Sequence, residues 1–518
     1  MSLAKILWVD DEIESLQSQK LFLEGKGYEV HTLTNGFDAI DYVKENPVDV
    51  VLMDESMPGI TGLETLAKIK EVNQQIPIVL ITKNETENLM DDAIGSQISD
   101  YLIKPVNPNQ VLLSLKKILD NRRLVAEKTT TSYQQQFRTL FMALNSSPDH
   151  NEWMDIYKKL VYWELEMEKS DSPEMQEVLQ TQKSEANTEF FKFISRNYSS
   201  WVKPKSSEGP VMSHSLMQLK VLPHLEKGTP LFFILIDNLR FDQWKAIQPI
   251  FSESFRILEE DSFYSILPTA TQYARNAIFT GMLPIDIEKN YPTQWKNDDE
   301  QGGKNLMEQE FLMSHLKRLG KTDLKVSYTK VTNNQAGLDL VNNIHNMLNN
   351  DLNVIVYNFV DMLSHARTEL EVLKELASDE ISYRSITKSW FEHSPLHQAL
   401  KKISEKNIKI VLATDHGSIK VKTPYKVVGD KQTTANLRYK HGRNLNYEPK
   451  EVLAFRDPRE AGLPVPTINS SYIFAREDGF LCYPTNYNYY ANYYRNTFQH
   501  GGVSLEEMIV PVIKMVNK

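Results

Sequence analysis

The chain has 518 residues, of which 41% are hydrophobic and 24% charged, and its formal net charge is −10. This length is too great for a single hydrophobic core and suggests roughly three domains of about 150 residues each. The negative charge excludes nucleic-acid binding by bulk electrostatics, although a local basic surface stays open, and the single cysteine, Cys482, excludes a disulfide framework or a cysteine-rich zinc site within the chain.

The first part of the chain alternates short apolar runs with amphipathic stretches. It lacks the long apolar segment of a secretory signal, and no later segment reaches the ~20 apolar residues of a membrane span, so we expect a cytoplasmic protein without a membrane partner. Buried parallel strands are predicted at residues 5–9, 48–53, 76–82 and 100–104. Amphipathic helices are predicted at residues 12–26, 62–73 and 109–121. This order predicts a doubly wound α/β domain over residues 1–121, with its functional groups at the carboxyl ends of the strands.

Polar residues stand at the ends of these predicted strands. Asp10 and Asp11 follow the first strand, Asp54 the third, Thr82 the fourth and Lys104 the fifth. Three carboxylates brought together at one sheet edge repel one another unless a cation joins them, and three hard oxygen ligands suit Mg²⁺. Asp54 is then the nucleophile toward a phosphoryl donor, Lys104 pairs with the phosphate, and Thr82 hydrogen-bonds it. The alternative, that these acids are ordinary loop residues, fits any one of them but not the ordered set.

The set Asp-Asp, Asp-x-x-Met-Pro-Gly, Thr and Lys-Pro resembles a response-regulator receiver domain over about residues 3–121. The resemblance implies that Asp54 is the phospho-acceptor, that Asp10 and Asp11 carry Mg²⁺, and that Tyr101 is the aromatic switch. Lys83 stands where the family often has alanine, a change that bears on switching but not on the acceptor chemistry.

Residues 122–205 differ in composition from what precedes them. Glycine is absent before the linker at 204–210, and glutamate, glutamine, lysine and spaced aromatics dominate. Apolar residues recur at helical spacing in 133–144, 152–167 and 174–198. The segment is predicted to be a helical bundle, with its aromatics in the core rather than around a cofactor.

Strands and helices alternate again over residues 206–518. Apolar runs predict buried strands at 231–237, 353–361, 408–415 and 509–516. This pattern indicates a second, larger α/β domain.

Chemically versatile residues cluster at the predicted strand ends of this domain. A histidine-rich set of Asp361, His365 and His500 forms one group of candidate metal ligands. A second group consists of Asp237, Thr271, Asp415 and His416. Each residue alone is more often a helix cap or a satisfied polar group than a ligand. Together, carboxylate and imidazole favour Zn²⁺ or Mn²⁺ over Mg²⁺, so two zinc ions are expected here.

A pair of such metals serves in-line displacement at phosphorus. One metal lowers the pKa of the Thr271 hydroxyl and presents it as the nucleophile, while the other stabilises the leaving oxygen. Arg275, four residues later, either sits over the transferred phosphoryl group or makes a salt bridge on a helix surface.

This layout resembles the alkaline phosphatase superfamily, in its PglZ-type branch, over about residues 210–518. The motifs that carry the resemblance are Asp237, the Pro-Thr-x-Thr turn ending in Thr271, Asp361-x-x-x-His365, Asp415-His416-Gly417 and His500-Gly-Gly. A threonine nucleophile, as in the phosphodiesterase members, and no obvious extra acidic set for a third metal favour diesters over monoesters.

Two further stretches bear on the substrate. A basic run after the Asp-His-Gly corner either cradles a nucleotide backbone or is a solvated loop face: Lys420, Lys422, Lys426, Lys431, Arg438, Lys440 and Arg443. The tyrosine-rich stretch 483–496 either stacks bases or packs as a wall of the cleft, and we expect packing.

The order of receiver, helical middle and PglZ-like domain resembles the PorX-type response regulators, a family linked to type IX secretion. The resemblance implies a sensor histidine kinase, phosphorylation-dependent homodimerisation and a sigma factor as partners. The sequence thus favours a zinc-dependent phosphodiesterase, acting on nucleotide or oligonucleotide diesters under control of Asp54 phosphorylation. The alternative is a signalling adaptor whose zinc is structural and whose output is protein contact; direct promoter binding fits worst, because no helix-turn-helix is evident and the net charge is negative.

Overall fold

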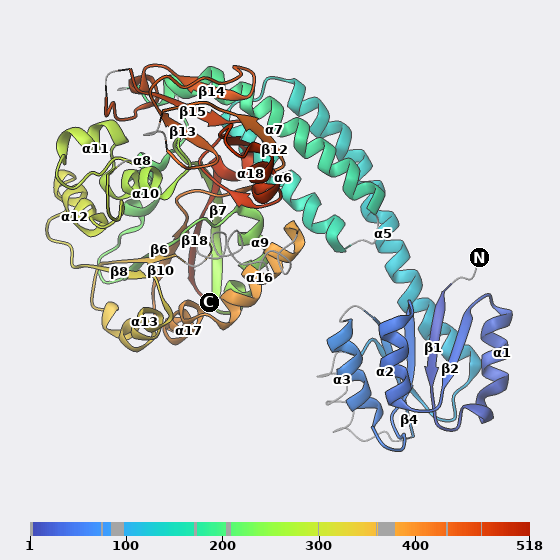
Figure 1. Cartoon of the computed structure of the whole chain (residues 1–518). Coiled ribbons are helices and arrows are strands. Elements are labelled where there is room, and N and C mark those ends of the chain that lie inside the picture. Colours follow the sequence, from blue (N-terminus) through green and yellow to red (C-terminus); the bar gives the residue numbers. More distant parts are fainter. Residues whose placement is uncertain are drawn as a thin grey trace. The chain divides into compact units, whose positions relative to one another are not determined.

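The computed structural model describes residues 4–73, 76–83, 98–169, 173–203, 209–298, 300–358, 360, 379–430, 434–467 and 469–518, without the side chains of 120–130 and 173–174. Two compact units divide the chain: residues 1–133 with 170–172, and residues 134–169 with 173–518. Each unit has a sheet at its centre, parallel in the smaller unit and mixed in the larger one (Figure 1).

The described residues of the smaller unit form a five-stranded parallel sheet in the order β2-β1-β3-β4-β5. Its strands are β1 Lys5–Val9, β2 Glu29–Leu33, β3 Val50–Asp54, β4 Ile78–Thr82 and β5 Asp100–Ile103. Its helices are η1 Ile13–Leu16, α1 Gln17–Gly25, α2 Gly36–Glu45, α3 Gly62–Val72 and the first part of α5 Pro108–Asn145.

Alternation along β1 shows why both faces of this sheet are covered. Ile6 and Trp8 pack in a core with α1 and α5, whereas Leu7 and Val9 pack in a second core with α2 and α3. The sequence pattern of continuous apolar strands follows from this double burial. The predicted doubly wound fold is confirmed.

The larger unit begins with long helices and continues as an α/β domain. Helices α6 His150–Lys169 and α7 Pro173–Trp201 follow the second part of α5. The predicted helices at 109–121 and 133–144 are one continuous helix, α5, because no proline or glycine interrupts residues 109–145.

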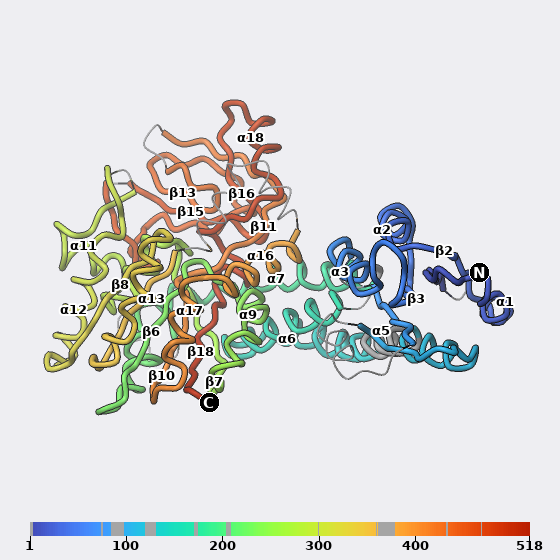
Figure 2. Tube along the Cα trace, turned by 90° about the horizontal axis from the view of Figure 1, so that it is seen from below, coloured from blue at the N-terminus to red at the C-terminus, as the bar shows by residue number. Residues whose placement is uncertain are grey.

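A six-stranded sheet in the order β7-β18-β10-β6-β9-β8 lies at the centre of the described part of this α/β domain (Figures 1 and 2). Strands β10, β6, β9 and β8 are parallel, whereas β18 runs antiparallel to both β10 and β7. The strands are β6 Leu231–Ile236, β7 Phe255–Tyr264, β8 Val326–Val331, β9 Leu352–Tyr357, β10 Lys409–Ala413 and β18 Ile509–Asn517.

Helices and small sheets surround this central sheet. The helical elements are α8 Ser213–Leu216, η2 Met217–Val221, η3 Leu222–His224, α9 Phe241–Ser254, α10 Thr271–Thr280, α11 Pro284–Asn290, α12 Glu308–Arg318, α13 Asn334–Met347, α16 Glu380–His393, α17 Pro395–Ile403, η4 Pro458–Ala461, α18 Tyr487–Tyr494 and α19 Leu505–Met508. The short strands are β11 Ile419–Lys420, β12 Thr423–Lys426, β13 Tyr439–Gly442, β14 Val452–Phe455, β15 Ser471–Ala475, β16 Gly479–Cys482 and β17 Phe498–Gln499; they pair as β11-β17, β12-β16 and β13-β15-β14.

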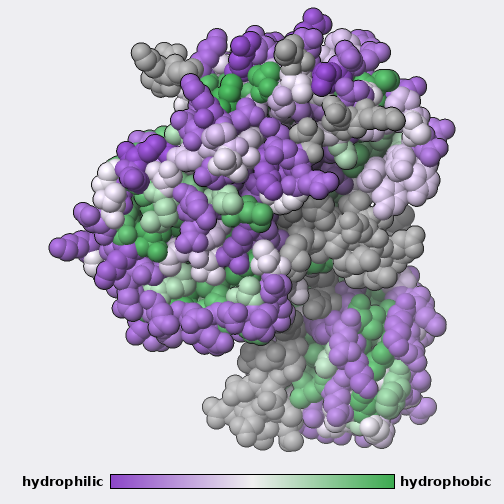
Figure 3. Space-filling view, turned by 60° about the vertical axis from the view of Figure 1, so that its left-hand side comes forward, coloured by the Kyte–Doolittle hydropathy of each residue, from purple (hydrophilic) through white to green (hydrophobic). Residues whose placement is uncertain are grey.

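The surface of the described residues is mostly polar. On the face drawn in Figure 3, hydrophobic side chains form small patches among hydrophilic ones. Within the described ranges, no helix is both long enough and apolar enough to cross a lipid bilayer.

Candidate active site

The receiver unit brings its strand-end acids together around a lysine. Asp10 follows β1 and Asp54 ends β3, and both side chains are buried. Lys104, directly after β5, places its Nζ 2.8 Å from Asp10 Oδ2 and 2.8 Å from Asp54 Oδ1. Asp11 is exposed, yet one oxygen from each of the three aspartates lies within 4.8 Å of the others. Three carboxylate oxygens at this spacing fit a Mg²⁺ ion.

The electrostatics of this pocket oppose ionisation of Asp54. Burial raises the pKa of the Asp54 carboxyl, and the charge of Asp10 adds to this, while the hydrogen bond from Lys104 acts in the other direction. The Lys104 ammonium is desolvated too, but its two carboxylate partners raise its pKa above the ordinary value. A cation or a phosphoryl group that binds here would therefore meet two carboxylates that are already paired with Lys104.

The predicted switch residues occupy the rim and interior of the same sheet edge. Thr82, the last residue of β4, is buried, and Tyr101 on β5 is 42% exposed. Lys83 reaches Glu12 with an Nζ–Oε2 distance of 3.4 Å, an exposed pair of little energetic weight. The switch role of Tyr101 stays a prediction.

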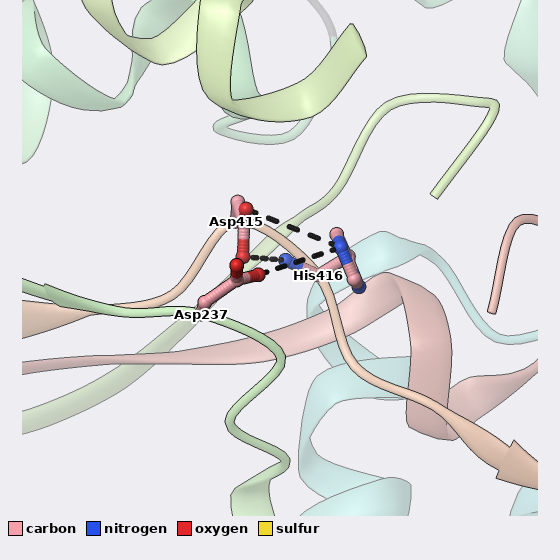
Figure 4. A group of neighbouring side chains, drawn as sticks. All are labelled: Asp237, Asp415 and His416. Carbon is pink, nitrogen blue, oxygen red and sulfur yellow. Dashed lines mark hydrogen bonds and ion pairs between the residues drawn. The ribbon is translucent and has the colours of Figure 1, made fainter. Parts of the chain in front are cut away.

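The larger unit builds its site at the carboxyl ends of two adjacent parallel strands. Asp237 follows β6 and Asp415 and His416 follow β10, whose residues pair in register up to Leu235 and Ala413. All three polar side chains are buried and point toward one another (Figure 4). His416 Nε2 lies 3.8 Å from Asp237 Oδ1 and 4.0 Å from Asp415 Oδ2.

Thr271 completes this group from a different element. It is the first residue of α10, and its Oγ1 lies 3.1 Å from His416 Nε2 and 3.4 Å from Asp237 Oδ1. Two carboxylates, an imidazole nitrogen and a hydroxyl thus converge, as the sequence predicted for one of the two zinc sites. This donor set fits a Zn²⁺ or Mn²⁺ ion.

The orientation of the His416 ring also fits metal binding. Its Nδ1 lies 3.1 Å from the Gly417 carbonyl oxygen, which accepts a hydrogen bond when Nδ1 carries the proton. Nε2 then presents its lone pair to Asp237 and Thr271. Metal-binding histidines commonly have this second hydrogen bond, because it fixes the tautomer and the ring orientation.

Only one residue of the other predicted metal set can be placed. The His500 ring stacks on His416 with centroids 4.2 Å apart, and its Nδ1 lies 3.1 Å from the Thr269 carbonyl oxygen. Asp361 and His365 lie outside the described residues. His500, directly after β17, therefore lies beside His416, while its role as a ligand and the second zinc site stay predictions.

Arg275 does not lie on a helix surface, and its place over a transferred phosphoryl group stays a prediction. Its guanidinium is fully buried, so the surface salt bridge is wrong. It pairs with Asp237, its Nε lies 2.9 Å from Asp415 Oδ2, and its Nη1 donates to Asn358 at 3.1 Å. Burial alone would raise the pKa of Asp415, but Arg275, followed by His416, holds it well below the ordinary value.

Gly417 is required by a close backbone approach. A Cβ at this position would lie 2.0 Å from the Glu506 carbonyl oxygen, and the Gly417 amide donates to the Glu507 carbonyl at 3.1 Å. Glu507 in turn receives hydrogen bonds from Arg438 at 3.1 and 2.6 Å. The glycine thus fixes the Asp-His corner against the segment that follows His500.

A buried ionic network, missed from the sequence, links the long helices to this corner. Lys183 on α7 lies 2.9 Å from Glu164 and 3.2 Å from Glu506, and Arg384 lies 2.8 Å from Glu164. Burial alone would raise the pKa of Glu164, but Lys183 and Arg384 hold it at about 2. Isolated charges in amphipathic helices carry no sequence signal for such long-range pairing.

A cavity of about 530 Å³ opens beside Thr271. Cationic and amide side chains that border it include Arg275, Lys304, Asn305, Lys330 and Asn358. Lys330 Nζ lies 2.7 Å from Glu308 and also donates to the Asn305 carbonyl at 2.7 Å. The acids Asp237, Glu308 and Glu310 border it as well, so the cavity brings cations, acids and amide groups together next to the threonine hydroxyl.

The predicted basic run is not one continuous surface. Arg438 and Lys440 are buried, which both sequence alternatives missed, whereas Lys422, Lys426 and Arg443 are exposed. Burial lowers the pKa of the Lys440 ammonium to about 7. Lys431 lies outside the described residues.

Comparisons with known families agree with this architecture. The family model described as the BREX system PglZ alkaline phosphatase-like domain matches residues 216–515. The PorX response regulator linker domain matches residues 123–202, and the response regulator receiver domain matches residues 6–116. The predicted order of receiver, helical middle and alkaline-phosphatase-like domain is confirmed.

Similar curated proteins match over the receiver region. The transcriptional regulatory protein ZraR of Klebsiella oxytoca is 36% identical over 132 residues, which is 26% of this chain and 30% of that protein. The transcriptional regulatory protein SrrA of Staphylococcus aureus (strain NCTC 8325 / PS 47) is 32% identical over 115 residues, 22% of this chain and 47% of that protein. The chain thus spans less than half the length of these relatives.

Solved structures match over the same region. The CheY-like receiver domain protein from Methanospirillum hungatei JF-1 is 28% identical, covers 23% of this chain and 96% of its own length, and has a TM-score of 0.23.

Proposed function

This chain belongs to the PglZ family, with domains that match a PorX-type response regulator, and we propose that its effector is a zinc-dependent phosphodiesterase controlled by Asp54 phosphorylation. One observation carries the proposal: the Thr271 hydroxyl lies 3.1 Å from His416 and 3.4 Å from Asp237, beside a cavity that Arg275, Lys304 and Lys330 help to line. A nucleophile beside metal-type ligands and positive charge suits attack on a phosphate.

The reaction is an in-line displacement in two steps. Thr271 Oγ1 attacks phosphorus while the bond from phosphorus to the leaving oxygen breaks, and an alcohol departs with a proton. Water then attacks the threonyl phosphate, the Oγ1–P bond breaks, and the phosphomonoester leaves. A bound zinc ion would lower the pKa of the Thr271 hydroxyl and stabilise the negative charge at phosphorus.

Residues of the chain orient the Thr271 hydroxyl and hold the charged groups around it in place. Asp237 Oδ1 accepts the hydrogen bond of Thr271 Oγ1 and so directs a lone pair of the hydroxyl toward the cavity. Arg275 holds both carboxylates in place through its pairs with Asp237 and Asp415. Lys330 adds positive charge on the cavity wall.

The receiver chemistry is the input to this site. An Asp54 oxygen attacks the phosphoryl group of a donor, the bond from phosphorus to the donor breaks, and Lys104 pairs with the resulting acyl phosphate. A Mg²⁺ ion held by Asp10 and Asp11 would offset the negative charge of the phosphoryl group. We propose nucleotide-type diesters as the substrates. Phosphorylation of Asp54 would cause the chain to form a homodimer. Contact with a sigma factor, in the control of type IX secretion, would be its physiological role.

Hydrolysis of a chromogenic phosphodiester tests the effector. Zinc-loaded wild type is expected to turn over, and Thr271→Ala to lose activity by several orders of magnitude, as when a nucleophile is removed from other hydrolases. Thr271→Ser, which keeps a hydroxyl, serves as the matched control and should retain activity. Equal rates for wild type and Thr271→Ala would refute the mechanism, and metal analysis of both proteins checks loading.

A signalling adaptor is the second candidate, and the position of Arg275 favours it. Because this arginine pairs with both Asp237 and Asp415, the two carboxylates hold the fold together whether or not Thr271 reacts. An adaptor predicts that Thr271→Ala leaves signalling intact while Asp54→Ala abolishes it. Loss of signalling in both variants supports the enzyme.

A further inference from the structure

Helix α7 presents one buried face to the domain that carries the candidate active site. Asn187 and Tyr198 are 11 positions apart (198 minus 187), which is about three turns of an α-helix, so their side chains lie on the same face. Phe190 and Ile194 lie between them on that face, and all four side chains are buried. The Phe190 ring stacks on Tyr264 at the end of β7, with centroids 6.3 Å apart. This face of the helix is thus packed against the central sheet.

Asn187 holds the segment that follows His500. Its side-chain amide donates to Glu506 Oε2 at 3.1 Å, and its side-chain oxygen accepts a hydrogen bond from the Leu505 amide at 2.8 Å. Lys183, one turn earlier on α7, lies 3.2 Å from Glu506 Oε1. The segment is therefore bound to α7 through both its backbone and its carboxylate.

This segment in turn fixes the backbone of the Asp-His corner. The Glu506 carbonyl oxygen lies so close to Gly417 that a Cβ there would be 2.0 Å away, and the Gly417 amide donates to the Glu507 carbonyl at 3.1 Å. Gly417 directly follows Asp415 and His416. A movement of the segment would therefore also move these two candidate metal ligands.

Tyr198 holds a second segment, the turn that leads to Thr271. The Leu267 amide donates to Tyr198 Oη at 2.8 Å, four residues before Thr271 (271 minus 267). The two held segments also contact each other, because Thr269 Oγ1 donates to the Gly502 carbonyl at 3.0 Å. One helix face thus binds both backbone segments that place the candidate nucleophile and the candidate metal ligands.

We propose that Asn187 and Tyr198 are positioning residues, through which α7 sets the 3.1 Å distance between Thr271 Oγ1 and His416 Nε2. Each acts through the backbone that carries a reacting group, in the way that supporting hydrogen bonds orient metal ligands. Because α7 belongs to the region that matches the PorX linker domain, that region is part of the support of the active site. The effect on zinc binding and turnover rests on the proposed function, whereas the hold of α7 on the two segments does not.

Amide hydrogen exchange of the full chain, freed of metal with a chelator, tests the hold directly. Asn187→Leu and Tyr198→Phe remove hydrogen bonds and keep most of the side-chain volume. Asn187→Leu should cause a loss of protection at residues 505–508 and at Gly417, because the Leu505 amide loses its acceptor and the corner loses its support. Tyr198→Phe should cause the loss at the turn before Thr271, where the Leu267 amide has lost its acceptor.

Gln182→Met is the matched control on the same helix. Gln182 is as buried as Asn187, but its side-chain amide donates to the Phe137 carbonyl of α5 at 3.1 Å. The substitution removes a buried hydrogen bond of α7 without touching either held segment. Protection of both segments should therefore stay as in wild type.

Zinc affinity and turnover test the consequence for the site. In competition with a chromogenic chelator, Asn187→Leu should bind zinc at least about tenfold more weakly than wild type, the low end of what supporting residues contribute. Tyr198→Phe should lower kcat for a chromogenic phosphodiester more than it raises KM, because it misplaces the nucleophile and leaves the cavity in place. Gln182→Met should match wild type in both measurements.

Wild-type protection in both Asn187→Leu and Tyr198→Phe would overturn the proposal. An equal loss in Gln182→Met would overturn it too, because the effect would then be a general loosening of α7. Lost protection with unchanged zinc affinity and kcat would refute the positioning role. If wild type itself binds no zinc and hydrolyses no diester, the proposed function fails, and hydrogen exchange alone decides whether α7 holds the two segments.

Discussion

The receiver site and the C-terminal site both place carboxylates at the carboxyl ends of neighbouring parallel strands, yet each pairs them with a different buried cation. Lys104 bridges Asp10 and Asp54, whereas Arg275 bridges Asp237 and Asp415. An ammonium is a compact charge on a flexible stem, and a guanidinium is a planar fork that binds two carboxylates at once. The receiver's cation is therefore the more easily re-directed of the two.

The acids respond in opposite ways. The pKa of Asp54 is raised, because burial and the neighbouring acids outweigh Lys104. The pKa of Asp415 is lowered, because Arg275 and His416 outweigh burial. The Asp54 carboxyl therefore gains from an incoming cation, while the protein's own groups already favour the charged form of Asp415. We infer that the receiver depends on its ion for charge balance and that the effector uses its ion for chemistry.

Removal of Arg275 tests this contrast and should have the largest effect. Arg275→Ala leaves Asp237 and Asp415 buried without their partner, and a broken buried pair costs about 3–5 kcal/mol. Urea unfolding followed by tryptophan fluorescence measures it, because every tryptophan except Trp8 lies in the larger unit. Zn²⁺ should stabilise the variant more than wild type, because the ion then supplies the missing charge.

The control for Arg275 is an exposed arginine. Arg459 pairs with Asp457 at 2.8 Å but its side chain is 71% exposed, so Arg459→Ala should leave the free energy of unfolding nearly unchanged. If Arg275→Ala unfolds like Arg459→Ala, the effector acids are not balanced by the protein, and the contrast between the two sites fails.

Lys440 shows what happens to a buried cation whose polar contacts are neutral. It donates to the Thr434 carbonyl at 3.0 Å and lies 4.4 Å from the Tyr483 ring centroid. Burial lowers its pKa from 10.5 to about 7. Between these values the unfolded chain holds a proton that the folded chain has lost, so stability rises with pH by up to about 1.4 kcal/mol per unit. Below pH 7 both states are protonated and this slope vanishes.

Lys440→Met should remove this slope and leave the rest of the pH profile in place. The measurement is the free energy of unfolding of wild type and variant across neutral and alkaline pH, where the difference between the two curves isolates Lys440. Parallel curves would mean that Lys440 stays charged in the folded protein, as Lys104 and Arg275 do.

Sequence reasoning located both sites because strand ends are readable from apolar runs. Asp10, Asp54, Asp237 and Asp415 each end or follow such a run, and adjacent parallel strands bring them together. The antiparallel course of β18 was not predictable, since a buried strand has the same apolar pattern in either direction.

Pairing between distant charges was the part that local pattern could not predict. Arg438 and Lys440 lie in a run that reads as a solvated face, but Arg438 meets Glu507, 69 positions later. Arg275 was expected near the phosphoryl group or on a helix surface, and its two aspartates lie 38 positions earlier and 140 later (275 minus 237; 415 minus 275). These contacts form because the fold brings the residues together, and the spacing of the residues along the sequence does not predict them.

Neutralisation of Asp54 should have the smallest effect on stability, and it tests whether the receiver site lacks compensating positive charge. Because the pKa of Asp54 is higher in the folded than in the unfolded chain, ionisation of this carboxyl opposes folding. The stability of the receiver therefore falls as pH rises above the ordinary pKa of 3.8. At neutral pH, Asp54→Asn removes this charge at nearly constant shape. We expect the receiver to become more stable in the absence of Mg²⁺, because a charged form that burial disfavours is removed.

Amide hydrogen exchange of β3, with Mg²⁺ or with a chelator, measures this locally. Wild type should gain protection from Mg²⁺ according to the ion's affinity, and Asp54→Asn should gain less, because one of three ligand oxygens is no longer charged. Asp41→Asn, an acid 73% exposed on α2, is the matched control and should respond to Mg²⁺ like wild type. Faster exchange in Asp54→Asn without Mg²⁺ would mean that the Lys104–Asp54 pair outweighs burial. The receiver would then be balanced by its own lysine, and the difference between the two sites would lie only in their metal ligands.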